Sequence, residues 1–533
     1  MRGHHWAAIA VAGVAGVLGG FGVAAGKGEL ARAGGTTLYV DRAFEIKTSD
    51  PQRALEPTAS IVDRAVFDTL FTFRRSDLTH PVPLLVTTWS ASKDAKTFVF
   101  RLRKDVHFAD GTPLTSADVV FSFRRLINLK DSPSFLLAGV DVSARGKYGV
   151  VLRSSRAYTA LPSILAMTPC GIVNSRLLRR HGGTDAQHAD QTDTAQPWFD
   201  SGASAGAGSG PYVLQRFTLK SPIVLTPNRR YTGRTAPAFT RVVLRNMLGI
   251  RQFVTIRHGA HQVALDLTPR QAQTLMHNTR LNVEQPPSTW LFWLFANSDP
   301  QVSPITSNKH FQHAVRAALD YKALVSLAGP GAIQAPGIIP AMFLGAQARS
   351  TLHRNLGRAR SELVASGVGD RTLTLEYPSD LTISGVSLAA LARKVQASLQ
   401  AAGFHVALAG SDIGTWLARY REGKIPFGLY LWEPDFPDAS DYLAFTPGDL
   451  VGLRVGWAKG SDPTVESLAA RARVTSAFKL REQLYRQLQL KLNQSGPFVP
   501  LIQPAHGFAA TKDLRNAVFN QQYEIDVTQV SPR

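Results

Sequence analysis

A short acidic segment near the C-terminal end holds the residue types best suited to bind a cation. Between Ile425 and Leu453 there are four Asp and one Glu but no Lys or Arg, although the whole chain carries a formal net charge of +20. An apolar, strand-like run, Phe427–Trp432, leads into a Pro-broken turn that bears these acids. A carboxylate at a strand end beside an aromatic ring can hold an ammonium group by ion pairing and a cation–π contact. A solvated acidic loop is the alternative interpretation.

A second pattern formally matches a catalytic serine. Gly202–Gly206 reads Gly-x-Ser-x-Gly, but a nucleophile elbow needs a buried strand before the serine and a helix after it. Here Pro197–Asp200 precedes the pattern, and a loose Gly/Ser-rich stretch follows it. We therefore interpret Ser204 as a loop residue and predict no catalytic residue. An exported serine hydrolase is the alternative from another functional class.

Histidines and cysteine give no recognisable metal site. The possible ligands have no zinc-like spacing and are more typical of solvated loops; they are His181, Asp185, His188, Asp190, His258 and His261. The single cysteine, Cys170, excludes an intramolecular disulfide and is expected to be a small buried apolar residue. The sequence thus predicts no metal and no cofactor.

Composition places the chain among soluble globular proteins. The residues are 44% hydrophobic and 18% charged, which is typical of this class. The length of 533 residues suggests three or four domain-sized units. The 59 Lys and Arg residues are scattered, with no run of five or more, so the excess of positive charge predicts no nucleic-acid-binding stripe. We expect no nucleic-acid partner.

The N-terminus has the features of an export signal. Arg2 precedes the uncharged run Trp6–Ala25, which ends in the small residues that a signal peptidase reads. This predicts a signal peptide over residues 1–26 and a periplasmic protein. The run is long for a signal-peptide core, so an uncleaved N-terminal membrane anchor is the alternative. No cysteine near its end could be lipidated.

The elements that must position the acidic segment alternate between strands and helices. Thr97–Arg103 alternates like a half-buried strand, and Thr115 with Asp118 forms a capping-box pattern at the start of a helix. Phe311–Val325 is expected to be one amphipathic helix. The polar, Gly/Ala/Ser-rich stretch His181–Gly210 is expected to be a surface loop or an interdomain crossing.

A third helix shows a complete crossover pattern. Leu388, Leu391, Val395 and Leu399 share one face, Gly403 provides the stop, and Phe404–Leu408 looks like the strand that follows. This helix–Gly–strand order is what an α/β crossover requires. The fold class predicted from these patterns is α/β.

An ordered set of segments resembles the dipeptide/oligopeptide/nickel group (family 5) of ABC-transporter extracellular solute-binding proteins. The resemblance covers nearly all of the chain after the export signal, and the similarity from Phe98 to Leu126 is the most specific. The other matching segments are Ser49-Asp50-Pro51, Asp63–Leu70, Pro83–Trp89, Gly208–Leu214, Asn228–Gly233 and Phe311–Tyr321.

This resemblance implies a periplasmic-binding-protein-like fold with two lobes, a hinge and an extra inserted domain, three domains in all. The expected division is residues 27–78, 178–286 and 500–533 for lobe I, 79–177 for the inserted domain II, and 287–499 for lobe III. Such a protein would be a monomer that captures di- or oligopeptides by lobe closure and delivers them to ABC permease subunits, with no enzymatic activity.

The resemblance also assigns candidate ligand-binding residues. Asp435 stands three residues after Trp432, the spacing with which peptide-binding relatives hold the ligand's α-ammonium group. Backbone around Leu431 and Glu433 would pair with an extended ligand as an added strand. Leu55 and Pro57 belong to a segment that would line the opposite wall.

The nature of the ligand stays open at this point. Some relatives carry an arginine three residues before the tryptophan, where this chain has Leu429, so the way a ligand carboxylate is bound is not predicted. A nickel chelate, an opine, a sugar or a cationic peptide are alternative solutes for the same fold.

Overall fold

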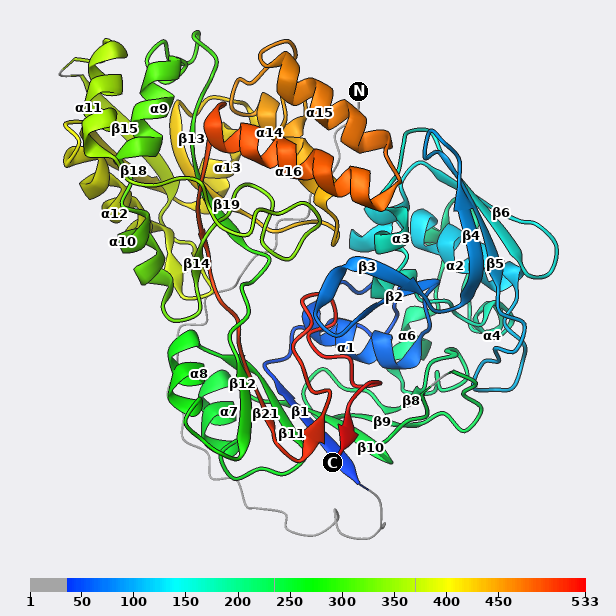
Figure 1. Cartoon of the computed structure of the whole chain (residues 1–533). Helices are drawn as coiled ribbons and strands as arrows, with labels where there is room; N and C mark the ends of the chain where they lie inside the picture. The colour runs from blue at the N-terminus through cyan, green and yellow to red at the C-terminus, as the bar shows by residue number, and fades with distance from the viewer. Residues whose placement is uncertain (1–35, 234, 370) are drawn as a thin grey trace.

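The structure is a computed structural model that describes residues 36–233, 235–369 and 371–533. The predicted signal peptide, residues 1–26, lies outside these ranges. Within them, no helix is long and apolar enough to cross a membrane. Figure 1 shows two large α/β bodies, one above the other, with a smaller sheet beside the lower one. The predicted α/β class with several domains is confirmed.

The lower body, lobe I, is built on a seven-stranded mixed sheet in the order β12-β21-β11-β1-β10-β9-β8. Residues that alternate along β11 belong to different apolar clusters: Val263 and Leu265 pack with α1, whereas Ala264 packs with α7 and α8. The sheet is therefore buried on both faces. Its elements are β1 Thr37–Arg42, α1 Pro57–Val66, β8 Tyr212–Arg216, β9 Ile223–Pro227, β10 Arg241–Asn246, α7 Gly249–Thr255, β11 Gln262–Leu267, α8 Pro269–Leu275, β12 Leu281–Glu284 and β21 Gly507–Thr511.

The inserted domain II has a four-stranded antiparallel sheet in the order β4-β5-β7-β6, with α2 packed against it. The predicted strand is confirmed as β5, whose Phe98, Phe100 and Leu102 are buried. The predicted capping box is also confirmed, since the Thr115 backbone N–H donates to the Asp118 carboxylate at 2.9 Å. Its elements are β4 Val86–Ala91, β5 Thr97–Leu102, α2 Ser116–Asn128, β6 Val140–Ala144 and β7 Gly149–Ser154.

Between these two sheets lie shorter elements. A two-stranded sheet, β2–β3, precedes domain II, and a series of short helices follows it. These elements are β2 Phe71–Arg74, β3 Asp77–Pro83, α3 Leu161–Ile164, α4 Ser175–Arg180, α5 Ala189–Thr192 and α6 Gln196–Asp200. The stretch His181–Gly210, expected to be a surface loop, thus holds two short helices and a fully buried Asp193 side chain. Much of the stretch is exposed, as a surface loop would be, but the two short helices and the buried ion-pair partner Asp193 are not loop features.

The upper body, lobe III, has a six-stranded sheet in the order β14-β20-β13-β19-β15-β18. Strand β13 reads Leu-Phe-Trp-Leu-Phe-Ala, and all six residues are buried because both faces of the sheet are covered. Its main elements are β13 Leu291–Ala296, α9 Lys309–Ala318, α10 Tyr321–Val325, β14 Ile333–Gln334, α11 Leu356–Ala365, β15 Thr372–Pro378, α12 Leu388–Gln400, β18 His405–Ser411, α13 Ile413–Arg421, β19 Phe427–Trp432, α14 Leu450–Leu453, α15 Pro463–Val474, α16 Phe478–Gln494 and β20 Phe498–Gln503.

Two predictions for lobe III have different outcomes. Helix α12 buries the predicted Leu388, Leu391, Val395 and Leu399 and is followed by Gly403 at φ +99° and strand β18, which confirms the crossover. The single helix expected over 311–325 is wrong, because α9 ends at Ala318 and α10 begins at Tyr321. The break follows from Asp320, whose side chain accepts the Ala323 N–H at 3.0 Å and so starts a new helix.

Two neighbouring chain crossings join lobe I to lobe III. One leads from β12 to β13 and the other from β20 to β21, and they bond to each other: His506 N–H donates to Pro286 O at 2.8 Å, and Ser288 N–H to Pro504 O at 2.7 Å. Paired crossings of this kind form a hinge between two rigid bodies. The predicted lobe boundary at 499/500 falls within β20, which continues to Gln503.

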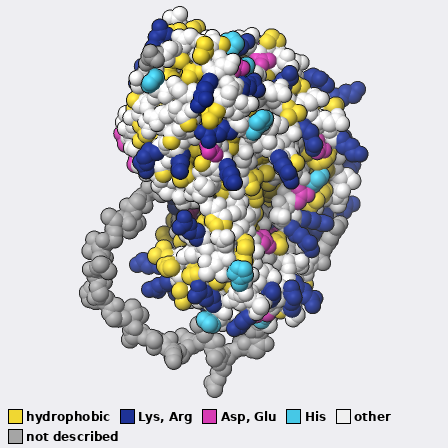
Figure 2. Space-filling model, turned by 60° about the vertical axis from the view of Figure 1, so that its left-hand side comes forward, with side chains coloured by type: hydrophobic (Ala, Val, Ile, Leu, Met, Phe, Trp, Pro, Cys, Tyr) yellow, Lys and Arg dark blue, Asp and Glu magenta, His cyan; other side chains and the backbone are white. Residues whose placement is uncertain are grey.

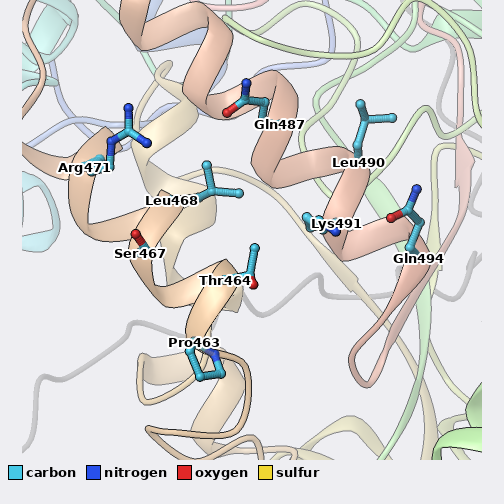
Figure 3. A pocket seen from close by; sticks show the side chains of 9 residues that line it. All are labelled: Pro463, Thr464, Ser467, Leu468, Arg471, Gln487, Leu490, Lys491 and Gln494. Carbon is cyan, nitrogen blue, oxygen red and sulfur yellow. The ribbon is translucent and has the colours of Figure 1, made fainter.

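The surface agrees with the scattered charge seen in the sequence. In Figure 2 the Lys and Arg side chains are spread over both lobes of the visible face and do not form a single stripe. A surface groove of about 650 Å³ lies between α15 and α16 on lobe III (Figure 3). Arg471 and Lys491 contribute its charges and no acid lines it, so this groove does not suit a cationic ligand.

Candidate functional site

Strand β19 carries the predicted binding residues to the end of the lobe III sheet. It pairs with β13 along its whole length, so that Trp432 stands opposite Leu291 and Leu431 opposite Phe292. On its other side β15 runs parallel with Glu376 opposite Gly428 and ends at Pro378, two residues further on. Among the described strands, the last residues of β19 therefore have no neighbour on that edge.

The turn after β19 closes around one carboxylate. The Trp432 indole N–H donates to Asp441 Oδ2 at 3.1 Å, and the Asp435 backbone N–H donates to the same oxygen at 3.2 Å. The Trp432 ring also stands edge-on against Phe445, with 5.5 Å between the ring centroids. Asp441 thus fixes the relative position of Trp432 and Asp435. The sequence prediction missed this role, although Asp441 belongs to the acidic segment.

Three carboxyl groups of this turn lie together without a cation. Burial and the neighbouring Asp441 and Glu433 carboxylates raise the pKa of Asp435 well above its usual range. Burial also raises the pKa of Asp441, against the effect of its two hydrogen bonds. In the described part of the chain, no Lys, Arg or His forms an ion pair with Glu433, Asp435 or Asp441.

A fourth acid of the same turn shows the opposite situation. Asp438 is buried, and Arg481 of α16 bonds both of its carboxylate oxygens, one at 2.9 Å. Burial alone would raise the pKa of Asp438, but the Arg481 guanidinium holds it below its usual value. The Ser163 hydroxyl of α3 donates to the same carboxylate at 3.4 Å and so connects the two bodies. Asp438 is a structural ion pair and is not available to a ligand.

Glu433 faces lobe I from lobe III. Its side chain is exposed to solvent, yet surrounding protein raises its pKa, and the Glu524 and Glu45 carboxylates of lobe I add to that effect. The Thr289 hydroxyl, next to the hinge, donates to Glu433 Oε1 at 3.4 Å. The contact with Thr289 therefore places Glu433 near the hinge end of lobe III, close enough for two acids of lobe I to affect its pKa.

The predicted opposite wall reaches the same region. Leu55 is half-buried and packs against an apolar cluster that contains Leu161 of α3 and Tyr442 of lobe III, and Trp432 and Phe436 pack against that cluster too. Pro57 is the first residue of α1 and is also half-buried. Leu55 and Trp432 thus both lie at the edge of the large apolar cluster that runs from domain II into lobe III.

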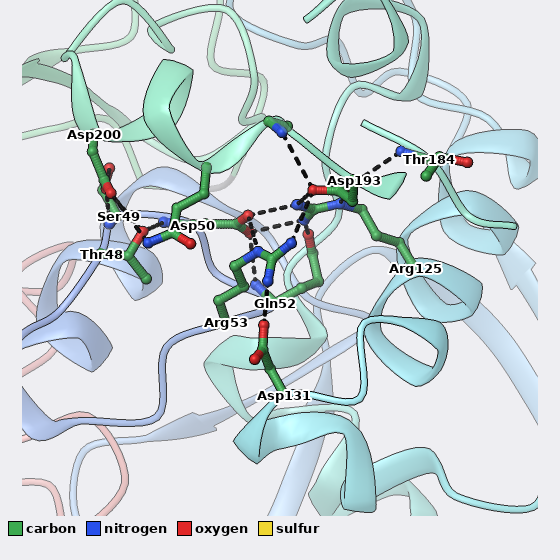
Figure 4. A network of polar contacts seen from close by, with 12 residues as sticks. Thr48, Ser49, Asp50, Gln52, Arg53, Arg125, Asp131, Thr184, Asp193 and Asp200 are labelled. Atoms are coloured by element: carbon green, nitrogen blue, oxygen red, sulfur yellow. Dashed lines mark hydrogen bonds and ion pairs between the residues drawn. The ribbon is translucent and has the colours of Figure 1, made fainter. Parts of the chain in front are cut away.

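A buried ion-pair network holds the segment that leads to Leu55 (Figure 4). Arg125 of α2 bonds Asp50 at 2.8 and 2.5 Å and Asp193 at 2.7 and 2.9 Å, and all three side chains are fully buried. Arg53 adds a bond of 3.1 Å to Asp193 and an ion pair with Asp131. Because Asp50 and Arg53 immediately precede Leu55, this network fixes that wall to domain II.

The remaining candidates from the sequence do not form reactive sites. Ser204 is 2% exposed, with no strand directly before it and no helix directly after it, so the nucleophile elbow is absent there. His181 stacks on Trp198 with 4.3 Å between ring centroids. The described residues contain no group of three or more His, Cys, Asp or Glu side chains that could hold a metal ion. Cys170 is fully buried, as expected.

Two α/β lobes joined by paired crossings, with an acidic turn at the end of the lobe III sheet, are the architecture expected of a solute-binding protein. Comparison with known proteins agrees with this class. The family model described as "Bacterial extracellular solute-binding proteins, family 5 Middle" matches residues 80–449. The chain therefore belongs to family 5 of the bacterial extracellular solute-binding proteins.

Individual relatives are distant in sequence and similar in fold. A probable D,D-dipeptide-binding periplasmic protein of Escherichia coli (strain K12) is 26% identical over 448 residues, covering 83% of this chain and 82% of that one. The solved structure of HbpA2 from Haemophilus parasuis has a TM-score of 0.80 at 19% identity and covers 93% of this chain and 100% of that one. The unliganded open form of the periplasmic murein tripeptide-binding protein MppA has a TM-score of 0.79 at 19% identity, covering 94% and 98%.

Proposed function

We propose that this protein is the solute-binding component of an ABC importer and captures peptides through their α-ammonium group. The observation that carries the proposal is the cation-free carboxyl cluster of Glu433, Asp435 and Asp441. Asp441 is buried and Asp435 half-buried, and placing carboxylates there without a cation is unfavourable; the raised pKa values of both express that cost. A ligand ammonium at Asp435 supplies the missing charge.

The ligand backbone has a place beside the same residues. Beyond Tyr430, the edge of β19 at Leu431 has no neighbouring strand in the described part of the sheet. An extended peptide could add to this edge by main-chain hydrogen bonds, with its amino end at Asp435. Leu55 and Pro57 would then contact it from lobe I. The names of relatives that bind dipeptides and a murein tripeptide support this ligand class.

Lobe closure supplies the mechanism of capture. The two neighbouring hinge crossings allow lobe III to move relative to lobe I, and a ligand that contacts both lobes binds the closed form more tightly than the open form. The closed form would then dock as a monomer on permease subunits. Export to the periplasm through the N-terminal run, cleaved or kept as an anchor, completes the proposal, and no catalytic step belongs to it.

The test compares free and blocked peptides on one variant. Asp435→Asn should weaken the binding of free-amine di- and tripeptides by about 100-fold, because removing one partner of an enclosed ion pair costs about 3 kcal/mol. Affinity for the N-acetylated forms of the same peptides should change little. Isothermal titration calorimetry measures both. Equal losses for free and acetylated peptides would contradict the ammonium role.

A matched control separates this effect from a change of net charge. Asp380 is an exposed aspartate of the same lobe, and Asp380→Asn makes the same chemical change on the surface. It should leave the affinity for both peptide forms at the wild-type level. If the wild-type chain bound an opine or a metal chelate but no peptide, the peptide ligand would be rejected. The assignment to solute-binding proteins would still hold.

A further inference from the structure

Helices α7 and α8 of lobe I expose an unusual amount of apolar surface. Leu248, directly before α7, is 66% exposed, Ile250 61% and Val254 55%, and Met276 at the end of α8 is 49% exposed. Both helices cover the same face of the sheet through one small apolar cluster, so these side chains belong to one part of the surface. Single exposed apolar residues are normal, whereas a group of them marks an interaction surface.

The segment that carries these side chains is rich in arginine and poor in acids. From Met247 to Val283 the chain has a single acid, Asp266, and it is taken up by an ion pair with Arg42 at 2.9 Å. Four arginines lie in the same segment and have no carboxylate partner among the described residues: Arg251, Arg257, Arg270 and Arg280. On the lower lobe in Figure 2, hydrophobic side chains lie among Lys, Arg and His side chains.

The position of this surface relative to the start of the fold adds a third observation. The loop after α7 lies against the beginning of β1, where Tyr39 N–H donates to His261 O at 2.8 Å. Ten residues, 26–35, separate the uncharged run Trp6–Ala25 from Thr36. Ten residues span at most about 35 Å. A bilayer that took up this run would therefore lie within reach of α7.

We propose that the exposed face of α7 and α8 docks on the surface of an anionic lipid bilayer. Leu248, Ile250, Val254 and Met276 enter the head-group region, while the arginines contact lipid phosphates. The scarcity of acids within Met247–Val283 favours this partner, because a protein partner would ordinarily meet charges of both signs, whereas an anionic membrane selects cations alone. Docking holds the binding protein at the membrane that contains its importer.

The first experiment measures vesicle binding of the full chain. Vesicles of phosphatidylcholine with phosphatidylglycerol are compared with pure phosphatidylcholine, at low and high salt. The double variants Ile250→Ser/Val254→Ser and Arg251→Gln/Arg270→Gln should each lower the partition coefficient on anionic vesicles by about tenfold. The N-terminal run is the same in all variants, so differences between them report the helices. Wild-type binding by both double variants would overturn the proposal.

Matched controls come from lobe III. Val364 of α11 is 82% exposed, and Arg393 is exposed on α12, so Val364→Ser and Arg393→Gln repeat the chemical changes on another surface. They should leave vesicle binding unchanged. All variants should bind peptide like the wild type, since none alters the β19 turn. Loss of importer docking together with unchanged vesicle binding would assign the surface to a protein partner and reject the lipid.

A second measurement remains informative if the N-terminal run dominates vesicle binding. Cys170 is fully buried, so an environment-sensitive fluorophore can be attached to a Val254→Cys variant. Its emission should shift to shorter wavelength on anionic vesicles, and the same label at Val364→Cys should not respond. An unshifted label at position 254 on vesicles that bind the protein would overturn the proposal.

Discussion

Two clusters of acidic side chains in this protein differ in how their charge is compensated. In the first, around Arg125, Asp50 and Asp193 are fully buried and bonded by guanidinium groups. In the second, at the end of β19, Asp435 and Asp441 face each other and Glu433 without a cation. A buried acid whose cation belongs to the chain is part of the fold, whereas one whose cation is missing is a place for a ligand.

The comparison predicts opposite effects on stability. Arg125→Met removes the fully buried cation of the compensated cluster and leaves Asp50 and Asp193 with Arg53 alone. The free energy of unfolding should fall by about 3–5 kcal/mol, measured by denaturant titration. Arg393→Met, on the exposed surface of α12, is the control and should change it by less than about 0.5 kcal/mol. A small loss in the Arg125 variant would mean that this network does not stabilise the wall near Leu55.

The pH dependence of peptide affinity is the next largest effect. An ammonium ligand needs the ionised form of Asp435 and Asp441, whose pKa values are raised in the free protein. As the pH falls from 7 to 5, protonation competes with the ligand, so affinity should decrease by up to about tenfold per pH unit for each proton displaced.

Calorimetry in buffers of different ionisation enthalpy checks this directly, because binding should release protons. The α-amino group of a peptide, with a pKa of about 8, stays protonated over this pH range. Asp435→Asn should show a weaker dependence on pH. Proton release that is absent in the wild type would show that the carboxyls are already ionised and compensated.

These two clusters also show what the sequence could and could not predict. The strand Phe427–Trp432 and the capping box at Thr115 follow from local pattern, and the structure confirms both. The Arg125 partners lie 75 and 68 residues away in sequence, at Asp50 and Asp193, and no local pattern connects them. From sequence alone, the stretch that contains Asp193 therefore indicates only a surface loop or an interdomain crossing.

Within the site, sequence reasoning selected the correct segment but could not assign individual roles. The sequence alone does not distinguish the roles of Asp435, Asp438 and Asp441. Only the conformation of the turn shows that Asp438 pairs with Arg481 and that Asp441 accepts a hydrogen bond from the indole of Trp432. The break between α9 and α10 was unpredictable for a similar reason. In the sequence, Asp320 is compatible with a continuous helix or with the start of a new one, and only its capping bond to the Ala323 N–H shows which occurs.

The cation-free cluster should also destabilise the unliganded protein as the pH rises. Carboxyls whose pKa is raised by folding bind more protons in the folded than in the unfolded state, so stability falls as the pH increases from the unfolded value near 4 through the raised values. Asp435→Asn removes one of these groups. At pH 8 the unliganded variant should therefore be more stable than the wild type by about 1 kcal/mol, a difference that vanishes near pH 4.

Thermal unfolding at pH 4, 6 and 8 measures this prediction, with Asp380→Asn as the surface control. The sign of the change in stability distinguishes the two clusters, since Asp50→Asn in the compensated cluster should lower the stability at pH 8 whereas Asp435→Asn should raise it. A free-amine peptide at the same concentration should cancel the advantage of Asp435→Asn, because the tighter-binding wild type gains more stability from the ligand than the variant does. If Asp435→Asn destabilised the unliganded protein at pH 8, Asp435 would belong to a compensated network like that of Asp50. The presence or absence of a cation beside a buried acid would then no longer distinguish structural acids from ligand-binding acids.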